Sequence, residues 1–277
     1  MSESVIGTFH RSVDEGVERL NRGLPSLLAT GVVGGIDVSI GLFAFLVVLH
    51  ESGSRLLASL AFTIGFIALI LAKSELFTEN FLVPIAAAVA GKAKWRSILR
   101  LWAGTALLNL VGAFVVMGLA MSAFPELRAT AVSIGTHPVD LGITWAAFAD
   151  AILAGVTITL MTWMDRSTES VPAKLIAAIA IAFLLVAAPL QHAVVMSAEA
   201  FAALHAGAPF GYLDWLGAVA WAALGNIVGG VGLVTVLRLA QVGPEAVREE
   251  RERPDGASRV DAEPDGDDGR ADEATTA

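Results

Sequence analysis

The sequence predicts an all-α membrane protein with six transmembrane helices. Of its 277 residues, 55% are hydrophobic and only 16% are charged, and the mean hydropathy is +0.69. Six apolar segments of about spanning length follow one another between short polar stretches, a pattern that soluble domains of this size do not show. Polar residues interrupt the second and fifth segments. We therefore expect six crossings of a bilayer, two of them broken at membrane depth.

Composition divides the chain into three parts. Residues 1–26 are polar, with apolar residues at helical spacing, and form a cytoplasmic N-terminal segment. Residues 27–240 hold the six spans. Residues 241–277 form a tail that carries twelve acids and five arginines from Glu245 onward, so most of the net charge of −9 lies there. Because this tail has no aromatic residue and few large aliphatic ones, it is predicted to be disordered and cytoplasmic.

The spans are placed by their apolar runs and oriented by charge. They are expected at residues 27–49, 56–90, 101–124, 141–164, 175–204 and 215–237. Lysine and arginine gather between the second and third spans, between the fourth and fifth, and after the sixth. Since positive residues favour the cytoplasmic side, both termini are predicted to lie inside, as in a multi-pass protein of the inner or plasma membrane. Residues 125–140 are expected to form a loop on the outer face.

The second and fifth spans contain the predicted functional centre. Residues 56–90 are too many for one crossing, which needs about 20 residues, and Lys73–Asn80 interrupts them with three charges and a threonine. Such residues cannot face lipid, so they must line a cavity or pack within protein. The fifth span is interrupted in the same way from Pro189 to Glu199, where His192 lies.

The two halves of the chain resemble each other. Trp102, Asn109 and Gly112 of the third span have counterparts in Trp221, Asn226 and Gly229 of the sixth. A repeat of three spans inverts the second half relative to the first. Interrupted spans at matching positions of two inverted halves indicate a substrate path near the bilayer midplane. Residues 76–78 and 191–192 are therefore expected to meet.

These residues also resemble a known family. Glu75-Leu76-Phe77-Thr78 in a broken second span, a histidine in a broken fifth span, and the run 225–230 (Gly-Asn-Ile-Val-Gly-Gly) are similar to the formate/nitrite transporter family over about residues 15–240. The resemblance implies an aquaporin-like protomer, a homopentamer with one pore in each subunit, and passage of small monovalent anions or their conjugate acids. It implies no cofactor.

The resemblance also implies roles for individual residues. It implies an inner constriction at Leu76 and Phe77, a hydrogen bond between Thr78 and His192, an outer constriction at Phe62 and Leu185, and amides at Asn109 and Asn226 that bond backbone groups freed by the breaks. The chain departs from the family's better-known members where Gln191 and Met196 replace a glutamate and an asparagine. It also lacks the lysine that those members carry just before the fourth span.

Several side chains keep two interpretations. His192 is either a proton donor or positive partner for a weak acid, or a tie between the broken helices through Thr78. Glu75 either lines the pore or caps the restarting helix, and capping is favoured because a carboxylate suits an anion pore poorly. Glu199 lies either on the face of His192 or in the outer vestibule or a subunit contact. Asp37 either lines the pore or pairs with a neighbouring subunit.

The favoured function is a channel for small monocarboxylates or similar weak-acid anions. A pore for a cation or a neutral solute on the same scaffold is the alternative that the membrane acids favour. An intramembrane enzyme using His192 with Glu199 or Asp37 is the third. Against an enzyme, the sequence has no cysteine, no repeated His/Glu metal spacing and no serine nucleophile motif. It offers no phosphate loop or basic stripe, so no nucleic acid or cofactor is expected, and no metal ligands are assigned.

Overall fold

The computed structural model describes residues 3–254, and these are nearly all helical. In chain order the elements are α1 (Glu3–Asn21), α2 (Leu24–Ser52), α3 (Arg55–Ala72), η1 (Phe77–Phe81), α4 (Val83–Val89), α5 (Trp95–Ala123), η2 (Pro125–Leu127), α6 (Arg128–Asp140), α7 (Trp145–Arg166), α8 (Val171–Ala187), α9 (Ala193–His205), α10 (Tyr212–Ile227), η3 (Val228–Thr235), α11 (Val236–Val242) and α12 (Pro244–Glu252). No strand occurs within the described range.

Within residues 3–254, five helices are long and apolar enough to cross a membrane. They are α2, α3, α5, α7 and the continuous helix formed by α10, η3 and α11. Local signals set their ends. Ser54 caps α3 by accepting from the N–H of Leu57, and Thr144 caps α7 by accepting from Ala147. Gly53 ends α2 with a φ of 64°, which a glycine adopts without strain.

The remaining apolar helices are shorter and lie on either side of irregular backbone. α3 ends at Ala72, where Lys73 has a φ of 53°, and α4 begins only at Val83, with the short η1 between them. α8 ends at Ala187, and α9 begins at Ala193. The irregular residues between these helices lack helical hydrogen-bond partners, so other groups must bond their backbone inside the fold.

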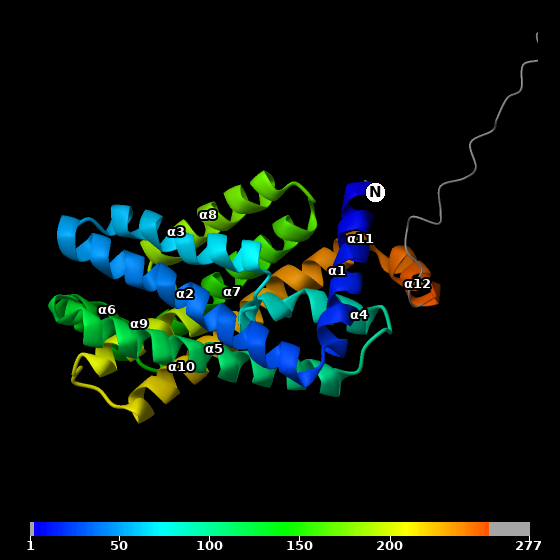
Figure 1. The fold of residues 1–277 in the computed structure, drawn as a ribbon. Coiled ribbons are helices and arrows are strands. Elements are labelled where there is room, and N and C mark those ends of the chain that lie inside the picture. Colours follow the sequence, from blue (N-terminus) through cyan, green and yellow to red (C-terminus); the bar gives the residue numbers. More distant parts are fainter. Residues whose placement is uncertain (1–2, 255–277) are drawn as a thin grey trace, which may run out of the picture.

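The long helices run side by side, and a short helix covers each end of them (Figure 1). α2 packs against α3 and α5, α7 packs against α8, α10 and η3, and α3 contacts α8. α1 crosses the end of the bundle that holds the N-terminus and contacts α4, whereas α6 lies at the opposite end and contacts α9 (Figure 1). Both broken segments are thus enclosed by other helices.

Glycines allow the closest helix contacts. A Cβ on Gly35 of α2 would lie 2.1 Å from the backbone oxygen of Asn109 in α5. A Cβ on Gly155 of α7 would lie 2.1 Å from the backbone oxygen of Asn226 in α10. No side chain fits at either place, because the obstructing atom belongs to a helix backbone that cannot turn away. These two contacts bring the backbone of Asn109 close to α2 and the backbone of Asn226 close to α7.

The structure differs from the sequence prediction in two places. Residues 125–140, expected to be an outer loop, form η2 and the helix α6, whose Ala131, Gly135 and Pro138 are buried. The tail, expected to be disordered from residue 241, begins with α12, in which Ala246 and Glu250 are buried against α1. Both segments are short and polar, so their order comes from tertiary contacts. Residues 255–277 of the predicted tail lie outside the described residues.

Gly35→Ala is expected to destabilise the fold because the added methyl group would clash with the α5 backbone. Overpacking of a close core contact typically costs about 1–3 kcal/mol, and a backbone obstacle puts this case at the upper end. Thermal unfolding in detergent measures the loss. Gly217→Ala in α10 is the matched control, since no atom lies within 4 Å of its added Cβ. Equal unfolding temperatures for the two variants would contradict the prediction.

Candidate functional site

The two broken segments meet at a buried pair of side chains. Thr78 lies in η1, His192 immediately precedes α9, and both are completely buried. The distance from Thr78 Oγ1 to His192 Nε2 is 2.6 Å. The backbone N–H of Val195 donates to His192 Nδ1 at 3.2 Å and so caps α9. Because Nδ1 is an acceptor, the neutral ring carries its proton on Nε2 and donates it to Thr78.

Asn109 of α5 makes three hydrogen bonds at the interruption between α3 and α4, residues 73–82, which we call the first break. Its Oδ1 accepts from the N–H of Phe77 at 2.8 Å, and its Nδ2 donates to the carbonyls of Gly31 and Glu75, each at 2.8 Å. Asn109 is itself completely buried. One amide therefore satisfies backbone groups on both sides of Leu76 and ties them to α2.

Asn226 of α10 makes the matching bonds at the interruption between α8 and α9, residues 188–192, which we call the second break. Its Oδ1 accepts from the N–H of Ala193 at 2.9 Å. Its Nδ2 donates to the carbonyls of Ala151 at 2.8 Å and Gln191 at 2.9 Å. The backbone on both sides of His192 is thus held to α7 in the way that the first break is held to α2.

Apolar side chains surround the buried pair. The ring of Phe77 lies edge-on to those of Phe81 and Trp102, with centroid distances of 5.0 and 6.2 Å. Trp102 also fixes η1 directly, because its Nε1 donates to the carbonyl of Asn80 at 2.8 Å. Four residues expected to form constrictions belong to the same buried core: Phe62, Leu76, Phe77 and Leu185.

Two arginines of α1 hold Glu75, which is only 1% exposed. Glu75 Oε1 pairs with Arg22 and lies 3.4 Å from Arg19 Nε. Arg19 is buried too, and it also donates to Asn80 Oδ1 at 3.1 Å. α1 is thereby joined to the backbone on both sides of Leu76–Thr78.

The predicted capping role of Glu75 is wrong. Glu79 makes the cap, because its Oε2 accepts from the N–H of Leu76 at 2.9 Å. A buried carboxylate needs a charged or hydrogen-bonded partner, and for Glu75 the guanidinium groups of α1 supply it. Sequence reasoning missed this pairing, because it depends on how α1 lies against the irregular backbone around Glu75.

The charged residues of α1 shift one another's pKa. Glu15 accepts from Arg19 Nε at 2.8 Å and from Arg166 at 2.9 Å. Burial alone would raise the pKa of the Glu15 carboxyl, but Arg19 and Arg166 outweigh burial and lower it from its ordinary 4.5 to about 2. Burial likewise opposes the charge of Arg19, yet Glu75 and Glu15 outweigh it and raise the Arg19 pKa above its usual range.

The two remaining acids of the predicted site have different surroundings. Ser74 Oγ donates to Asp37 Oδ2 at 2.5 Å, so Asp37 pairs within its own chain and ties α2 to the first break. This contact is neither of the roles expected for Asp37. Glu199 lines a cavity with Arg55, His137 and Gln191. Sequence reasoning missed Arg55, which begins α3.

A cavity lies on each side of the buried pair. The first, of about 300 Å³, includes Gln191, the neighbour of His192, in its lining. The second, of about 470 Å³, includes Ser74 and Glu79, which flank Leu76–Thr78, together with charged residues of α1 and α7. We call these the far cavity and the near cavity, after their distance from the N-terminus. The Thr78–His192 pair lies between them.

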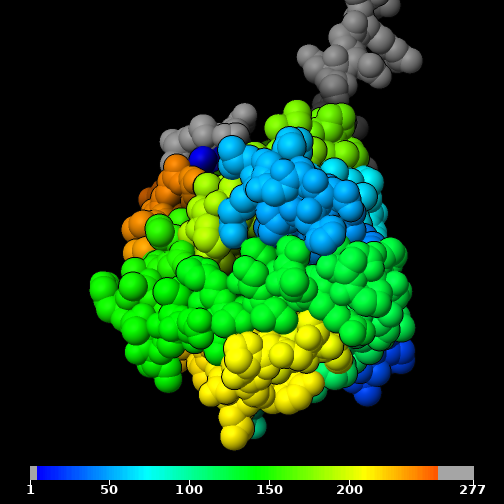
Figure 2. Space-filling model, turned by 90° about the vertical axis from the view of Figure 1, so that its left-hand side faces the viewer, coloured from blue at the N-terminus to red at the C-terminus, as the bar shows by residue number. Residues whose placement is uncertain are grey.

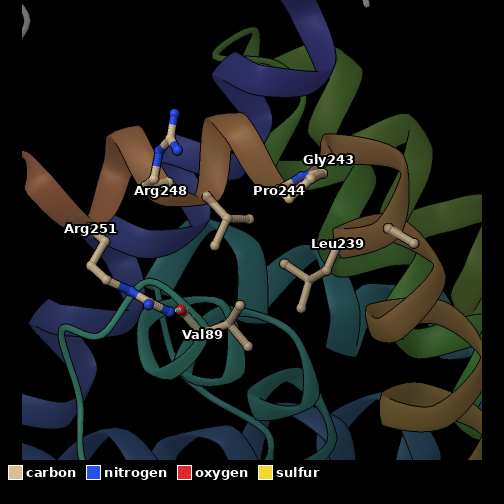
Figure 3. A pocket seen from close by; sticks show the side chains of 8 residues that line it. Val89, Leu239, Gly243, Pro244, Arg248 and Arg251 are labelled. Carbon is tan, nitrogen blue, oxygen red and sulfur yellow. Dashed lines mark hydrogen bonds between the residues drawn. The ribbon is translucent and has the colours of Figure 1, made fainter.

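A third cavity shares no lining residue with either. It measures about 490 Å³ and lies between α4, α11 and α12, where Val89, Leu239 and Val247 form apolar walls. Arg251 reaches across it and donates to the carbonyl of Val89 at 2.9 Å (Figure 3). Among residues 3–254, no group of three or more histidines and acids suited to a metal ion occurs.

Together these features define a membrane transport protein, with a buried polar pair between two cavities and enclosed by helices of spanning length. Comparison with known proteins identifies its family. The formate/nitrite transporter family matches residues 7–240, and the chain belongs to it. The resemblance drawn from residues 75–78 and 225–230 is thus confirmed.

Relatives and solved structures agree with this assignment. The inner membrane protein YfdC of Escherichia coli K12 is 30% identical over 243 residues, which cover 82% of this chain and 76% of YfdC. The formate channel BtFdhC of Bacillus thuringiensis is 26% identical and covers 80% of this chain and 89% of its own. An FNT family ion channel has the same fold, with a TM-score of 0.73 and 19% identity over 87% of this chain and 99% of that one.

Asn109→Leu is expected to destabilise the protein by about 2 kcal/mol, because it leaves the buried N–H of Phe77 and the carbonyl of Glu75 without a partner, at about 1 kcal/mol or more each. Asn226→Leu should cost a similar amount. Thermal unfolding in detergent is the measurement, with the exposed Asn21→Leu as the control of equal chemistry. An Asn109→Leu protein as stable as wild type would show that the amide does not hold the break.

Glu15→Gln is expected to loosen α1 at neutral pH. Since the folded pKa of about 2 lies below the ordinary 4.5, the ion pairs stabilise the fold above pH 4.5, and this stabilisation is lost as the pH falls toward 2. The shift corresponds to about 3 kcal/mol at most. The gap in unfolding temperature between variant and wild type should be wide at pH 7 and narrow at pH 3. Glu18→Gln, at a side chain 72% exposed, is the control and should change little at either pH.

Proposed function

We propose that this chain is a channel for small monovalent anions, such as formate or nitrite, or for their conjugate weak acids. The observation that carries the proposal is the buried Thr78–His192 pair, 2.6 Å apart, between two cavities. The family assignment and the printed description of the Bacillus thuringiensis relative as a formate channel support it. The family is one of transporters, which argues against an intramembrane enzyme.

The proposed path runs from one cavity to the other past His192. Leu76 and Phe77 form an apolar constriction on one side of the pair, and Phe62 and Leu185 form another on the opposite side. A bare anion loses most of its hydration in such a passage, at a cost of many kcal/mol, whereas the neutral acid loses much less. A hydronium ion from one cavity protonates His192, the charged ring passes one proton to the anion, the neutral acid leaves, and His192 returns to its neutral form.

The proposed pore centre forms where two inverted three-helix halves meet, with the second and fifth of six spans broken. Matched contacts support this arrangement. Asn109 bonds residues 75 and 77, and Asn226 bonds residues 191 and 193, so each asparagine bridges a single residue at its break. The contact of α2 with α3 and α5 is repeated by that of α7 with α8, α10 and η3.

We further propose a homopentamer in the inner membrane with both termini in the cytoplasm. One solved structure with the same fold, at a TM-score of 0.64, 22% identity and coverage of 78% of this chain and 96% of that one, is described as a pentameric formate channel with formate bound. The YfdC relative is described as an inner membrane protein. The basic residues of loop 91–95 and of Arg166–Lys174 lie at the same end as α1, in line with a cytoplasmic N-terminus.

A pore for a cation or a neutral solute is the second candidate, because Glu199 lines the far cavity. Asp37 lends it no support, since Asp37 is bonded to Ser74. A solute panel separates the two functions. Formate, nitrite, acetate and hydrosulfide represent the first, and ammonium and glycerol represent the second.

Purified protein in proteoliposomes is expected to pass formate faster than empty vesicles, with a flux that rises as the pH falls. His192→Ala should reduce this flux at least about tenfold, the usual range for loss of a proton-transfer group being about 10²–10⁴. His50→Ala, at an exposed position, is the matched control and should behave as wild type. A His192→Ala flux with the wild-type rate and pH profile would reduce His192 to a structural tie. Failure of folded wild type to pass any of the four anions would contradict the function.

A further inference from the structure

The far cavity carries one positive and one negative side chain from different helices. It lies at the end of the bundle opposite α1, the end that faces the viewer in Figure 2, where α6 passes between the α2–α3 turn and the α9–α10 connection. Arg55 comes from the first residue of α3, and Glu199 comes from the middle of α9. The other polar lining residues are Ser133 and His137 of α6 and Gln191.

Glu199 is held in place at the far cavity through its backbone. Gly135 of α6 packs directly on its backbone oxygen, where an added Cβ would lie only 2.2 Å away. The carboxylate is part-buried, and within residues 3–254 neither a hydrogen bond nor an ion pair reaches it. The carboxylate is therefore open to whatever occupies the cavity.

Arg55 is fixed at the same cavity. Its Nε and Nη2 donate to the carbonyl of Val186 at 3.2 and 3.0 Å, and its guanidinium lies over the ring of Phe45 at 5.8 Å. Val186 is in the last turn of α8, so this contact also satisfies a helix end just before the second break. No carboxylate in the described part of the chain lies within ion-pair distance of Arg55, so its charge also remains available.

We propose that Arg55 and Glu199 form a charge filter at the far mouth, with Arg55 attracting anions and Glu199 opposing them. This inference rests on the proposed function and specifies which residues set selectivity for it. A cleft lined by one sign of charge concentrates ions of the opposite sign and speeds their capture by about tenfold or more. Because the two charges oppose each other here, the mouth gives anions little advantage, and removing either charge shifts the balance.

The test measures formate influx into proteoliposomes at pH 7, where formate is an anion. Glu199→Gln should raise the influx about threefold at low ionic strength through a lower KM, with the maximal rate unchanged. Arg55→Gln should lower it by a similar factor. Both effects should shrink in high salt, because the screening length falls from about 30 Å at 0.01 M to about 3 Å at 1 M. Glycerol leakage, which carries no charge, should not change.

Controls separate charge from folding. Glu199→Asp and Arg55→Lys keep their charges and should remain close to wild type. Glu126→Gln removes an exposed carboxylate of η2, outside the cavity lining, and should have no effect. Each variant must elute from gel filtration as wild type does. If Arg55→Gln does not fold, the pair Glu199→Gln and Glu199→Asp still tests the filter alone.

The outcomes are distinct. Wild-type flux with no change of KM or salt dependence in Glu199→Gln would overturn the filter and leave the proposed function intact. A folded wild-type protein that passes no formate would overturn both. A rise in formate influx for Glu199→Gln that high salt abolishes, with Glu199→Asp unchanged, would establish the filter.

Discussion

The structure depends on one constraint, which is that every backbone group inside the bilayer must be hydrogen-bonded within the protein. α3 and α8 end inside the helix bundle, where the free N–H and C=O groups that follow them are shielded from water. Asn109 and Asn226 satisfy these groups with two hydrogen bonds each, and a third bond ties each asparagine to a carbonyl of α2 or α7. Only because the breaks are held in this way can Thr78 and His192 stay together in an otherwise apolar core.

Close contacts at glycines hold one helix across each end of the bundle. A Cβ on Gly16 of α1 would lie 2.1 Å from the backbone oxygen of Val83 in α4, and one on Gly135 of α6 would lie 2.2 Å from that of Glu199 in α9. Val83 follows Phe77 by six residues, and Glu199 follows Ala193 by six. α6 therefore covers one end of the bundle as α1 covers the other. Residues 125–140, expected to be a loop, are therefore ordered by packing: Gly135 of α6 fits against α9 as Gly16 of α1 fits against α4.

The sequence predicted the features that depend on polarity along the chain. The breaks, the two asparagines and the meeting of residues 76–78 with 191–192 all follow from polar residues where a span should be apolar. The order of α6 and α12 did not follow, because both helices are polar and take their stability from contacts with distant residues. The pairing of Glu75 with Arg19 and Arg22 also depended on a fold in which α1 turns back over the first break.

The near and far cavities differ in whether their charged side chains form ion pairs. This difference bears on where the proposed channel can select solutes by charge. The near cavity is lined by five basic and five acidic residues, many of them joined in ion pairs such as those of Glu15 and Asp165. Paired charges neutralise one another over a short distance, so a solute there meets a weak field. In the far cavity, Arg55 and Glu199 form no ion pair with any described residue, so both side chains are open to a solute. The buried centre, in contrast, offers the same apolar walls and the same His192 to every small acid. In the proposed channel, discrimination by charge therefore belongs to the far mouth, and discrimination by proton affinity to the centre.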